Sequence, residues 1–66
     1  MKITYDRETD VLLIALGKKP PVQARDAWPD AVLHYDDEDK LTEIEVLNAS
    51  LLCDVRALAK YKAAAA

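Results

Sequence analysis

The apolar run Val11–Leu16 constrains the fold more than any other stretch of this sequence. Asp10 precedes the run, and the glycine and prolines of residues 17–21 follow it. An apolar run of six residues between turn-forming residues is typical of a strand that is buried on both faces, and it is too short for a packed helix. We therefore expect a central strand over residues 11–16, with the rest of this 66-residue chain folded around it.

The alternation that precedes this run predicts a hairpin over residues 1–16. Ile3 and Tyr5 alternate with polar residues, as they would in a strand with one buried face. Pairing Tyr5 with Leu12 leaves residues 7–10 as a four-residue loop, which is a common hairpin size. A shift of one residue would send the larger side chains of the second strand to the opposite face. We therefore predict the register in which Tyr5 lies opposite Leu12.

A second hairpin is predicted over residues 31–47, because the pattern of the first recurs there. The apolar, tyrosine and acidic positions return at an offset of thirty residues, in the order Leu33-x-Tyr35-Asp36-x-Glu38-x-x-Leu41-x-x-Ile44. The same reasoning places Tyr35 opposite Thr42, with residues 37–40 as the loop. We expect the two hairpins to be related and their turns to be equivalent.

The remaining segments complete an α+β fold. Residues 17–30 are predicted to form an irregular connection with a short edge strand, because Pro20 and Pro21 cannot lie in a central strand. Ser50 is a suitable N-cap for a helix over about 50–62. The stripe expected to cover the sheet is Leu51, Leu52, Val55, Leu58 and Tyr61. The prediction is a single domain over residues 1–66, with an antiparallel sheet of four or five strands (two related hairpins plus a short edge strand) and one C-terminal α-helix.

The small size of the chain predicts a homodimer. Chains below about 70–80 residues rarely build a sufficient core and rely on disulfides, a metal or a second chain. Cys53 is the single cysteine and His34 the single histidine, so neither a disulfide nor a four-ligand zinc site can form within one chain. Trp28 can act either as an interface anchor or as a cap on its own sheet. The predicted interface residues are Val11, Leu13 and Ala15, which form a second apolar face, and Trp28.

The charge balance limits the classes of partner. A formal net charge of −3 argues against binding to nucleic acid phosphates, which requires clustered lysine and arginine. It favours a basic protein partner. The sequence has no secretory signal pattern and no apolar run long enough to cross a bilayer. Together with the lone cysteine, this predicts a cytoplasmic protein that does not contact membranes.

Three groups of residues have both a chemical and a structural interpretation. His34 with Glu43 and Glu45 could form a general base with its orienting carboxylate, or an ordinary cross-strand pair on an exposed face. The acidic stretch 36–39 could bind a cation, although it lacks the spacing of an EF-hand loop, or be a solvated turn. Cys53 could be a reactive thiol or a passive helix residue. We favour the structural interpretation of each and predict no catalytic residue, metal ligand or cofactor.

The ordered motifs of the chain resemble those of a known family. They are Met1-Lys2-Ile3-Thr4-Tyr5-Asp6-x-Glu8-x-Asp10-x-Leu12, Leu33-x-Tyr35-Asp36-x-Glu38 and Leu41-x-x-Ile44-Glu45-Val46-Leu47-x-Ala49-Ser50. Over about residues 1–52 the sequence is similar to small prokaryotic proteins of the domain-of-unknown-function 2283 family. The resemblance implies an antiparallel sheet with a terminal helix, and no catalytic residue or established activity to transfer. It also implies a neighbourhood of toxin-like genes for some members. Asp39 departs from the glycine that the family tends to show in the second turn.

These observations lead to two functional hypotheses. The first is a small, acidic, homo-oligomeric protein-interaction module, antitoxin-like by analogy with the family, that binds a basic protein partner. The alternative is a small enzyme with an active site at the oligomer interface, using His34, Glu43 and Glu45.

Overall fold

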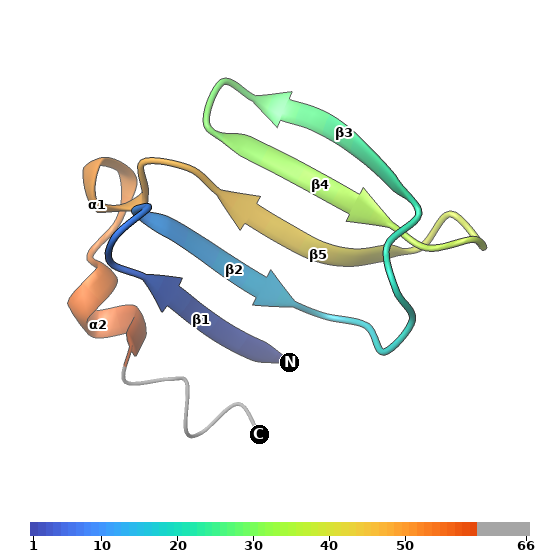
Figure 1. Ribbon diagram of the computed structural model, residues 1–66, viewed down its shortest axis with the longest axis horizontal. Helices are drawn as coiled ribbons and strands as arrows, with labels where there is room; N and C mark the ends of the chain where they lie inside the picture. The colour runs from blue at the N-terminus through green and yellow to red at the C-terminus, as the bar shows by residue number, and fades with distance from the viewer. Residues whose placement is uncertain (60–66) are drawn as a thin grey trace.

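The computed structural model describes residues 1–59, in which five strands form one antiparallel sheet (Figure 1). The strands are β1 (Lys2–Asp6), β2 (Val11–Ala15), β3 (Gln23–Trp28), β4 (Ala31–Tyr35) and β5 (Leu41–Val46). Their order in the sheet is β1-β2-β5-β4-β3. Two short helices follow, α1 (Ala49–Leu52) and α2 (Val55–Ala59). The predicted class, an antiparallel sheet with helical structure near the C-terminus, is confirmed.

The register of the first hairpin agrees with the prediction from side-chain burial. Tyr5 lies opposite Leu12 and Ile3 lies opposite Ile14, with residues 7–10 as the loop. Leu12, which is only 2% exposed, is the most buried large apolar side chain of the described residues. Because strand side chains alternate with a period of two, burying Leu12 determines which face every residue of β1 and β2 occupies.

The second hairpin has a different turn from the first, so the predicted equivalence is wrong. Leu33 lies opposite Ile44 as expected, but Tyr35 pairs with Leu41 and not with Thr42. The register shifts between His34 and Tyr35, which makes Thr42 the extra residue of a β-bulge. Thr42 is nearly fully buried there, and its hydroxyl donates to the carbonyl of His34 at 3.2 Å. The loop between the strands is therefore residues 36–40.

The carboxylate of Asp36 explains this longer turn. It accepts hydrogen bonds from the backbone amides of Glu38 at 2.8 Å and Lys40 at 3.0 Å. Asp6, the corresponding residue of the first hairpin, accepts only the amide of Glu8, at 3.0 Å. By holding two turn amides, the Asp36 side chain stabilises a loop that is one residue longer than the first. The bulge at Thr42 absorbs the extra residue, so that His34 and Glu43 lie opposite each other. The composition of the two turns is similar, but their hydrogen bonding is not.

The thirty-residue repeat nevertheless appears in the strand pairing. Ile14 and Ile44, which are equivalent in the repeat, lie directly opposite each other where β2 pairs with β5. Ile3 pairs with Ile14 on one side, and Leu33 pairs with Ile44 on the other. One apolar row therefore crosses four strands, and the two hairpins are related by an approximate two-fold axis between Ile14 and Ile44.

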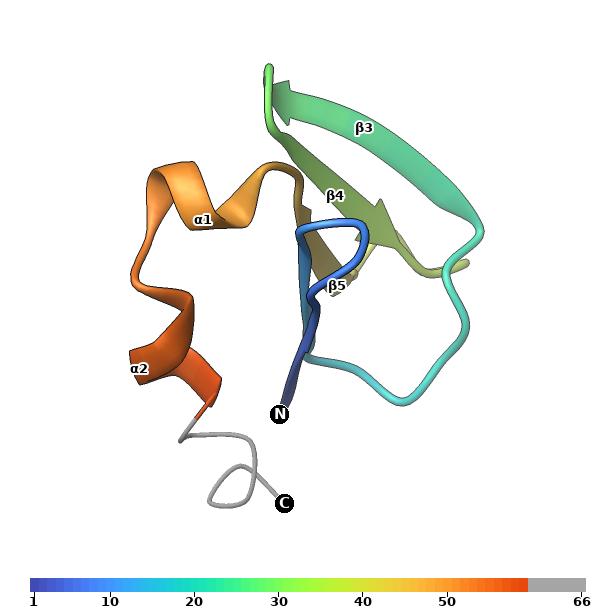
Figure 2. The ribbon, with the colours of Figure 1, turned by 60° about the vertical axis from the view of Figure 1, so that its left-hand side comes forward.

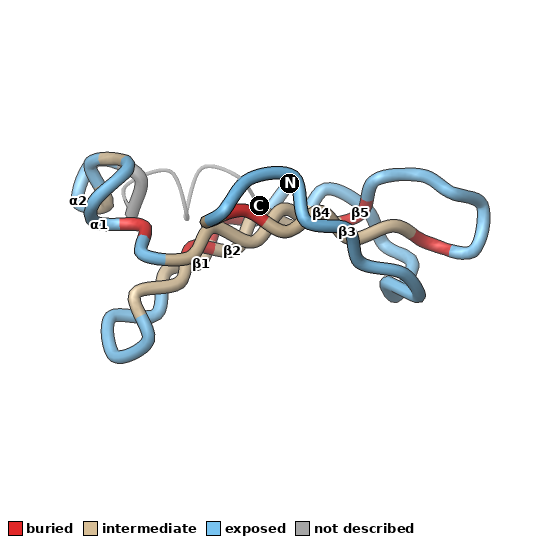
Figure 3. Tube along the Cα trace, turned by 90° about the horizontal axis from the view of Figure 1, so that it is seen from above, coloured by how far each residue is buried: buried red, intermediate tan, exposed pale blue. Residues whose placement is uncertain are grey.

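The side chains of β2 are less buried than its apolar sequence predicts. β2 is an interior strand, but β5 occupies the middle of the sheet. Of the five residues of β2, Leu12 alone is buried, and the other four are half-buried. The molecule measures 33 × 28 × 16 Å, and Figure 3 shows only short buried segments along the trace. The expected burial of β2 on both faces is therefore wrong, because among the described residues only the two short helices cover the sheet.

The single helix predicted over about 50–62 is replaced by two short ones. Cys53 adopts an extended conformation (φ −152°, ψ 164°) and ends α1. The carboxylate of Asp54 then accepts the amides of Arg56 at 3.1 Å and Ala57 at 3.3 Å, which caps α2. Asp54 therefore starts a second helix instead of continuing the first. Residues 60–62 of the predicted helix lie outside the described residues.

Helix α1 begins with Asn48 in the left-handed region (φ 52°), so the prediction of Ser50 as N-cap is wrong. The predicted stripe is only partly in contact with the sheet. Val55 packs against the core formed by Ile3, Leu12 and Ala49, whereas Leu51 is 82% exposed. Figures 1 and 2 show both helices at one corner of the molecule, where β1 ends and β2 begins. No helix of residues 1–59 is both long and apolar enough to span a membrane.

The left-handed conformation of Asp39 (φ 61°) leads to a first testable prediction. A Cβ atom in this conformation costs about 1 kcal/mol, which glycine avoids. We expect Asp39→Gly to have a free energy of unfolding about 1 kcal/mol higher than Asp39→Ala. Both variants lose the exposed contact of Asp39 with Arg25, so urea denaturation of the pair isolates the backbone effect. An alanine variant as stable as the glycine variant would contradict this explanation.

Candidate functional site

The strand register divides the side chains between two faces with different chemistry. The helix face, on which α1 and α2 lie, carries Ile3, Tyr5, Leu12, Ile14, Ala31, Leu33, Tyr35, Ile44 and Val46. The carboxylate face carries Lys2, Thr4, Asp6, Val11, Leu13, Ala15, Val32, His34, Glu43 and Glu45. The apolar residues Val11, Leu13 and Ala15 and the acidic residues of β5 therefore lie on the same side of the single-layered sheet.

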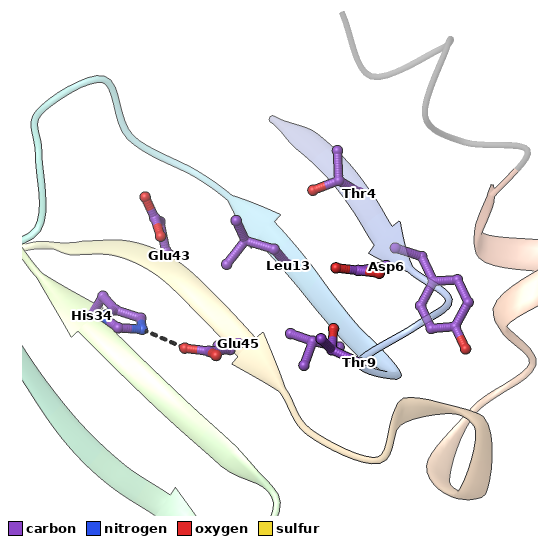
Figure 4. A pocket seen from close by; sticks show the side chains of 9 residues that line it. Thr4, Asp6, Thr9, Leu13, His34, Glu43 and Glu45 are labelled. Carbon is purple, nitrogen blue, oxygen red and sulfur yellow. Dashed lines mark hydrogen bonds and ion pairs between the residues drawn. The ribbon is translucent and has the colours of Figure 1, made fainter.

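A groove of about 580 Å³ lies on the carboxylate face (Figure 4). Its lining residues are Thr4, Tyr5, Asp6, Thr9, Val11, Leu13, His34, Glu43 and Glu45. Leu13 lies between the acidic residues of β5 and those of β1, because it pairs with Thr4 on one side and with Glu45 on the other. The groove thus has an apolar floor with carboxylates on both flanks. None of the described residues that line it is a lysine or an arginine.

The structure brings together the three residues of the enzyme hypothesis. His34 Nε2 lies 3.0 Å from Glu45 Oε1, and Glu43 is directly opposite His34 in the strand register. Both members of the His34–Glu45 pair are partly buried. Within residues 1–59 the Glu43 carboxylate has neither a hydrogen bond nor an ion pair, so it is available to an external donor. The arrangement can orient an imidazole and can bind a cation.

The negative charge of the acidic turn 36–39 is partly compensated by the chain itself. The Lys19 ammonium contacts Glu38 at 2.7 Å and Asp37 at 3.1 Å, and the pKa of Lys19 is raised by these hydrogen bonds. The amides of Lys40 and Glu38 lower the pKa of Asp36. The carboxylates of Asp36, Asp37 and Glu38 lie close enough to share a cation, but a lysine and turn amides already hold them. The turn therefore presents less negative charge than its sequence indicates.

The four predicted interface residues do not form one surface. Val11, Leu13 and Ala15 lie half-buried on the carboxylate face. Trp28 pairs with Ala31, and Ala31 pairs with Val46 of the helix face, so the register places Trp28 on the opposite side. Trp28 is 64% exposed, so it does not bury itself as a cap within the described chain.

Cys53 is a half-buried residue of the helical corner. Its thiol donates to the carbonyl of Ala49 at 3.2 Å, and its side chain packs against the core. These contacts fit the interpretation of Cys53 as a structural residue. They give the thiol a fixed backbone acceptor and no cationic partner within residues 1–59.

The sequence interpretation did not find the contact that attaches the helical corner to the sheet. The Asp10 carboxylate accepts the Tyr5 hydroxyl at 2.6 Å, the Ser50 amide at 3.0 Å and the Ser50 hydroxyl at 2.7 Å. These hydrogen bonds lower the pKa of Asp10, and the bond from the Tyr5 hydroxyl has the largest effect. The bond between Tyr5 and Asp10 also raises the pKa of Tyr5. Asp10 and Ser50 are forty residues apart, so no local pattern signals their contact.

Comparison with known proteins places the chain in a family. The family model described as a protein of unknown function (DUF2283) matches residues 2–50, which include all five strands and the start of α1. No curated protein and no solved structure matches the chain. The match confirms the resemblance seen in the motifs around Tyr5 and Tyr35. The chain belongs to the DUF2283 family of proteins of unknown function.

Proposed function

We propose that this protein is an interaction module that binds a basic segment of a protein partner in the groove of its carboxylate face. The observation that carries the proposal is the composition of that groove. Asp6, Glu43 and Glu45 surround an apolar floor, and no lysine or arginine of the described chain lines it. Lysine and arginine side chains combine an aliphatic stem with a cationic head, so they suit a floor of Val11 and Leu13 with carboxylates at its rim.

The shape of the molecule favours a protein partner over a small ligand. Small-molecule sites are concave and bury most of the ligand surface. A sheet one layer thick, in a molecule 16 Å across its shortest dimension, cannot enclose a ligand in this way. A protein segment can lie along an open groove and supply the opposite wall itself. An antitoxin that covers a basic toxin is one form of this function, by analogy with the family neighbourhood.

A binding-rate measurement tests this proposal. A basic protein captured by the immobilised chain from extract of its own organism serves as the analyte. Rim charges act mainly on the association rate and its salt dependence. We expect the double variant Glu43→Gln/Glu45→Gln to associate about tenfold more slowly, with a flatter response to salt.

The acidic turn supplies the matched control for this experiment. The double variant Asp37→Asn/Glu38→Gln removes the same formal charge, but from two carboxylates that share the Lys19 ammonium and do not line the groove. It should associate at close to the parental rate. Equal slowing by both variants would show a general charge effect and would contradict a groove-specific site. Far-ultraviolet circular dichroism of each variant checks that the fold is retained.

The second candidate function is a small enzyme, favoured by the 3.0 Å contact between His34 and Glu45. In this candidate His34 acts as a general base, Glu45 orients it, and Glu43 binds a cationic group of the substrate. The groups still required, a nucleophile or an oxyanion donor, would come from a second subunit at the interface. Turnover by the purified protein that His34→Gln abolishes would support this function over the binding module.

A further inference from the structure

Half of the helix face is left open by the helices. The core under α1 and α2 contains Ile3, Leu12 and Ala49, at the β1 side of the sheet. The other half, which we call the open half, consists of Leu33, Tyr35, Ile44 and Trp28 on β4, β5 and β3. Figures 1 and 2 show no helix over these strands. The open half is the repeat equivalent of the covered half, because Leu33 and Tyr35 correspond to Ile3 and Tyr5.

The helix face is also the side of the sheet with almost no charge. Along β1, β2, β5 and β4 its described residues are all uncharged. On β3, Arg25 lies 4.6 Å from the centre of the Tyr35 ring and 3.0 Å from an Asp39 oxygen, so its charge is already compensated. In a two-fold dimer the same surface meets itself. Pairing through the carboxylate face would bring Glu43 and Glu45 against their own copies, whereas pairing through the helix face would not.

Edge-to-edge pairing between copies through β3 is disfavoured by the features of that strand. β3 carries the adjacent charges Arg25 and Asp26, contains a register shift between Asp26 and Trp28, and is followed by Pro29. Charges, bulges and prolines are the features that protect sheet edges from pairing with another chain. The two faces of the sheet are therefore better suited to self-association than the edge at β3.

We infer that a second copy of this chain covers the open half, with the α1 corner of each protomer seated on the open half of the other. Both helices lie at one end of the helix face, and no helix of the described chain lies over the other end, at β3 and β4 (Figure 2). A two-fold axis places the helical end of each protomer on the uncovered end of the other. Leu51 on α1 and Trp28 on β3, exposed by 82% and 64%, are the apolar groups that this contact buries. A stable interface buries roughly 800 Å² per partner, so the contact has to include both the open half and the helical corner of a face that spans 33 × 28 Å.

This dimer would leave both grooves of the carboxylate face pointing outward. It would therefore bind two basic segments and keep His34, Glu43 and Glu45 away from the copy-to-copy contact. The dimer does not depend on the proposed binding function, and it is tested on the protein alone. A failure of either proposal can thus be recognised without the other.

Sedimentation equilibrium between about 1 and 200 μM tests the inference. We expect the parent to have twice the 7.4 kDa chain mass at tens of micromolar. Trp28→Glu and Leu51→Lys should each weaken the dimer at least tenfold, since exposed positions on one chain tolerate charge until a partner covers them. Val22→Lys is the matched control, because Val22 is also 64% exposed but precedes β3 and is not part of the helix face. It should dimerise like the parent.

Mixing the two weakened variants tests the arrangement itself. The two-fold dimer has two equivalent contacts, each between Leu51 of one protomer and the open half, with Trp28, of the other. In a heterodimer of Trp28→Glu with Leu51→Lys, one contact keeps both parental residues. The other contact combines both substitutions. We expect the mixture to dimerise more tightly than either variant alone. A monomeric parent, a control that weakens as much as Trp28→Glu, or a mixture with no gain over the single variants would each overturn the inference.

Discussion

Replacing Leu12 by alanine is expected to lower the free energy of unfolding by about 2–5 kcal/mol, as large-to-small changes in protein cores do. Leu12 is 2% exposed and belongs to a core cluster whose other buried members, among the residues whose burial is described, are Ile3 and Ala49. So small a core has few neighbours that can move into the space left by the leucine side chain. The loss is a large part of the stability of a domain of this size, so we expect Leu12→Ala to be mostly unfolded at 37 °C.

The control for this variant is the same substitution four residues further along the chain. Leu16 is 43% exposed and lies just after β2. Leu16→Ala should therefore cost about 1 kcal/mol, because much of its side chain is already in water. Urea denaturation of the parent and both variants at one protein concentration gives the comparison. A cooperative urea transition of Leu12→Ala with a midpoint close to that of the parent would contradict the assigned core.

The second large effect is expected at Asp10, which connects the first hairpin to α1. Asp10→Ala removes the acceptor of the Tyr5 hydroxyl and of both Ser50 donors. It also places alanine in the left-handed region, where Asp10 has φ 58°. We expect a marked fall in Tm, larger than that of Asp10→Asn. Asparagine tolerates the left-handed conformation and keeps one of the two oxygen acceptors, so Asp10→Asn removes the charge and one acceptor without the backbone strain.

The pH dependence of the Asp10→Asn variant gives an independent measurement. The pKa of Asp10 in the folded protein is below its ordinary value of 3.8, so the unfolded chain binds a proton more readily. The stabilisation is therefore complete well above pH 3.8 and is lost as the pH falls through the lowered pKa. The stability gap between the parent and Asp10→Asn should shrink over that range. Asp36 titrates in the same direction in both proteins and cancels. A gap that stays constant down to pH 2 would contradict the role of the Asp10 charge.

Local pattern predicted the strands and the first register because strand periodicity is a property of neighbouring residues. The register between β1 and β2 that leaves a four-residue loop places Leu12 on the same face as Ile3 and Tyr5, and this register is observed. The thirty-residue repeat likewise predicted two related hairpins, whose equivalent residues Ile14 and Ile44 pair. The composition of the second turn did not predict the bulge at Thr42, because the bulge depends on which amides Asp36 holds.

The sequence predicted which residues belong to the candidate site, but it did not predict the surface that they form together. His34, Glu43 and Glu45 were expected on one face, and the register confirms this. Trp28 could not be assigned to a face from sequence, because the register shift after Asp26 changes the alternation along β3. The strand register of the folded sheet then decided that the groove and the exposed tryptophan lie on opposite sides.

By itself, the sequence determined the sheet class, the strands of both hairpins and the pairs Ile3–Ile14 and Leu33–Ile44 within them. These features arise from a period of two among residues close in the chain. Only the tertiary structure decided where the C-terminal segment breaks and what it covers. Asp10 binds Ser50 across forty residues, and Asp54 starts a new helix after Cys53. Such contacts form only once the sheet has brought distant backbone groups together, so no local pattern encodes them.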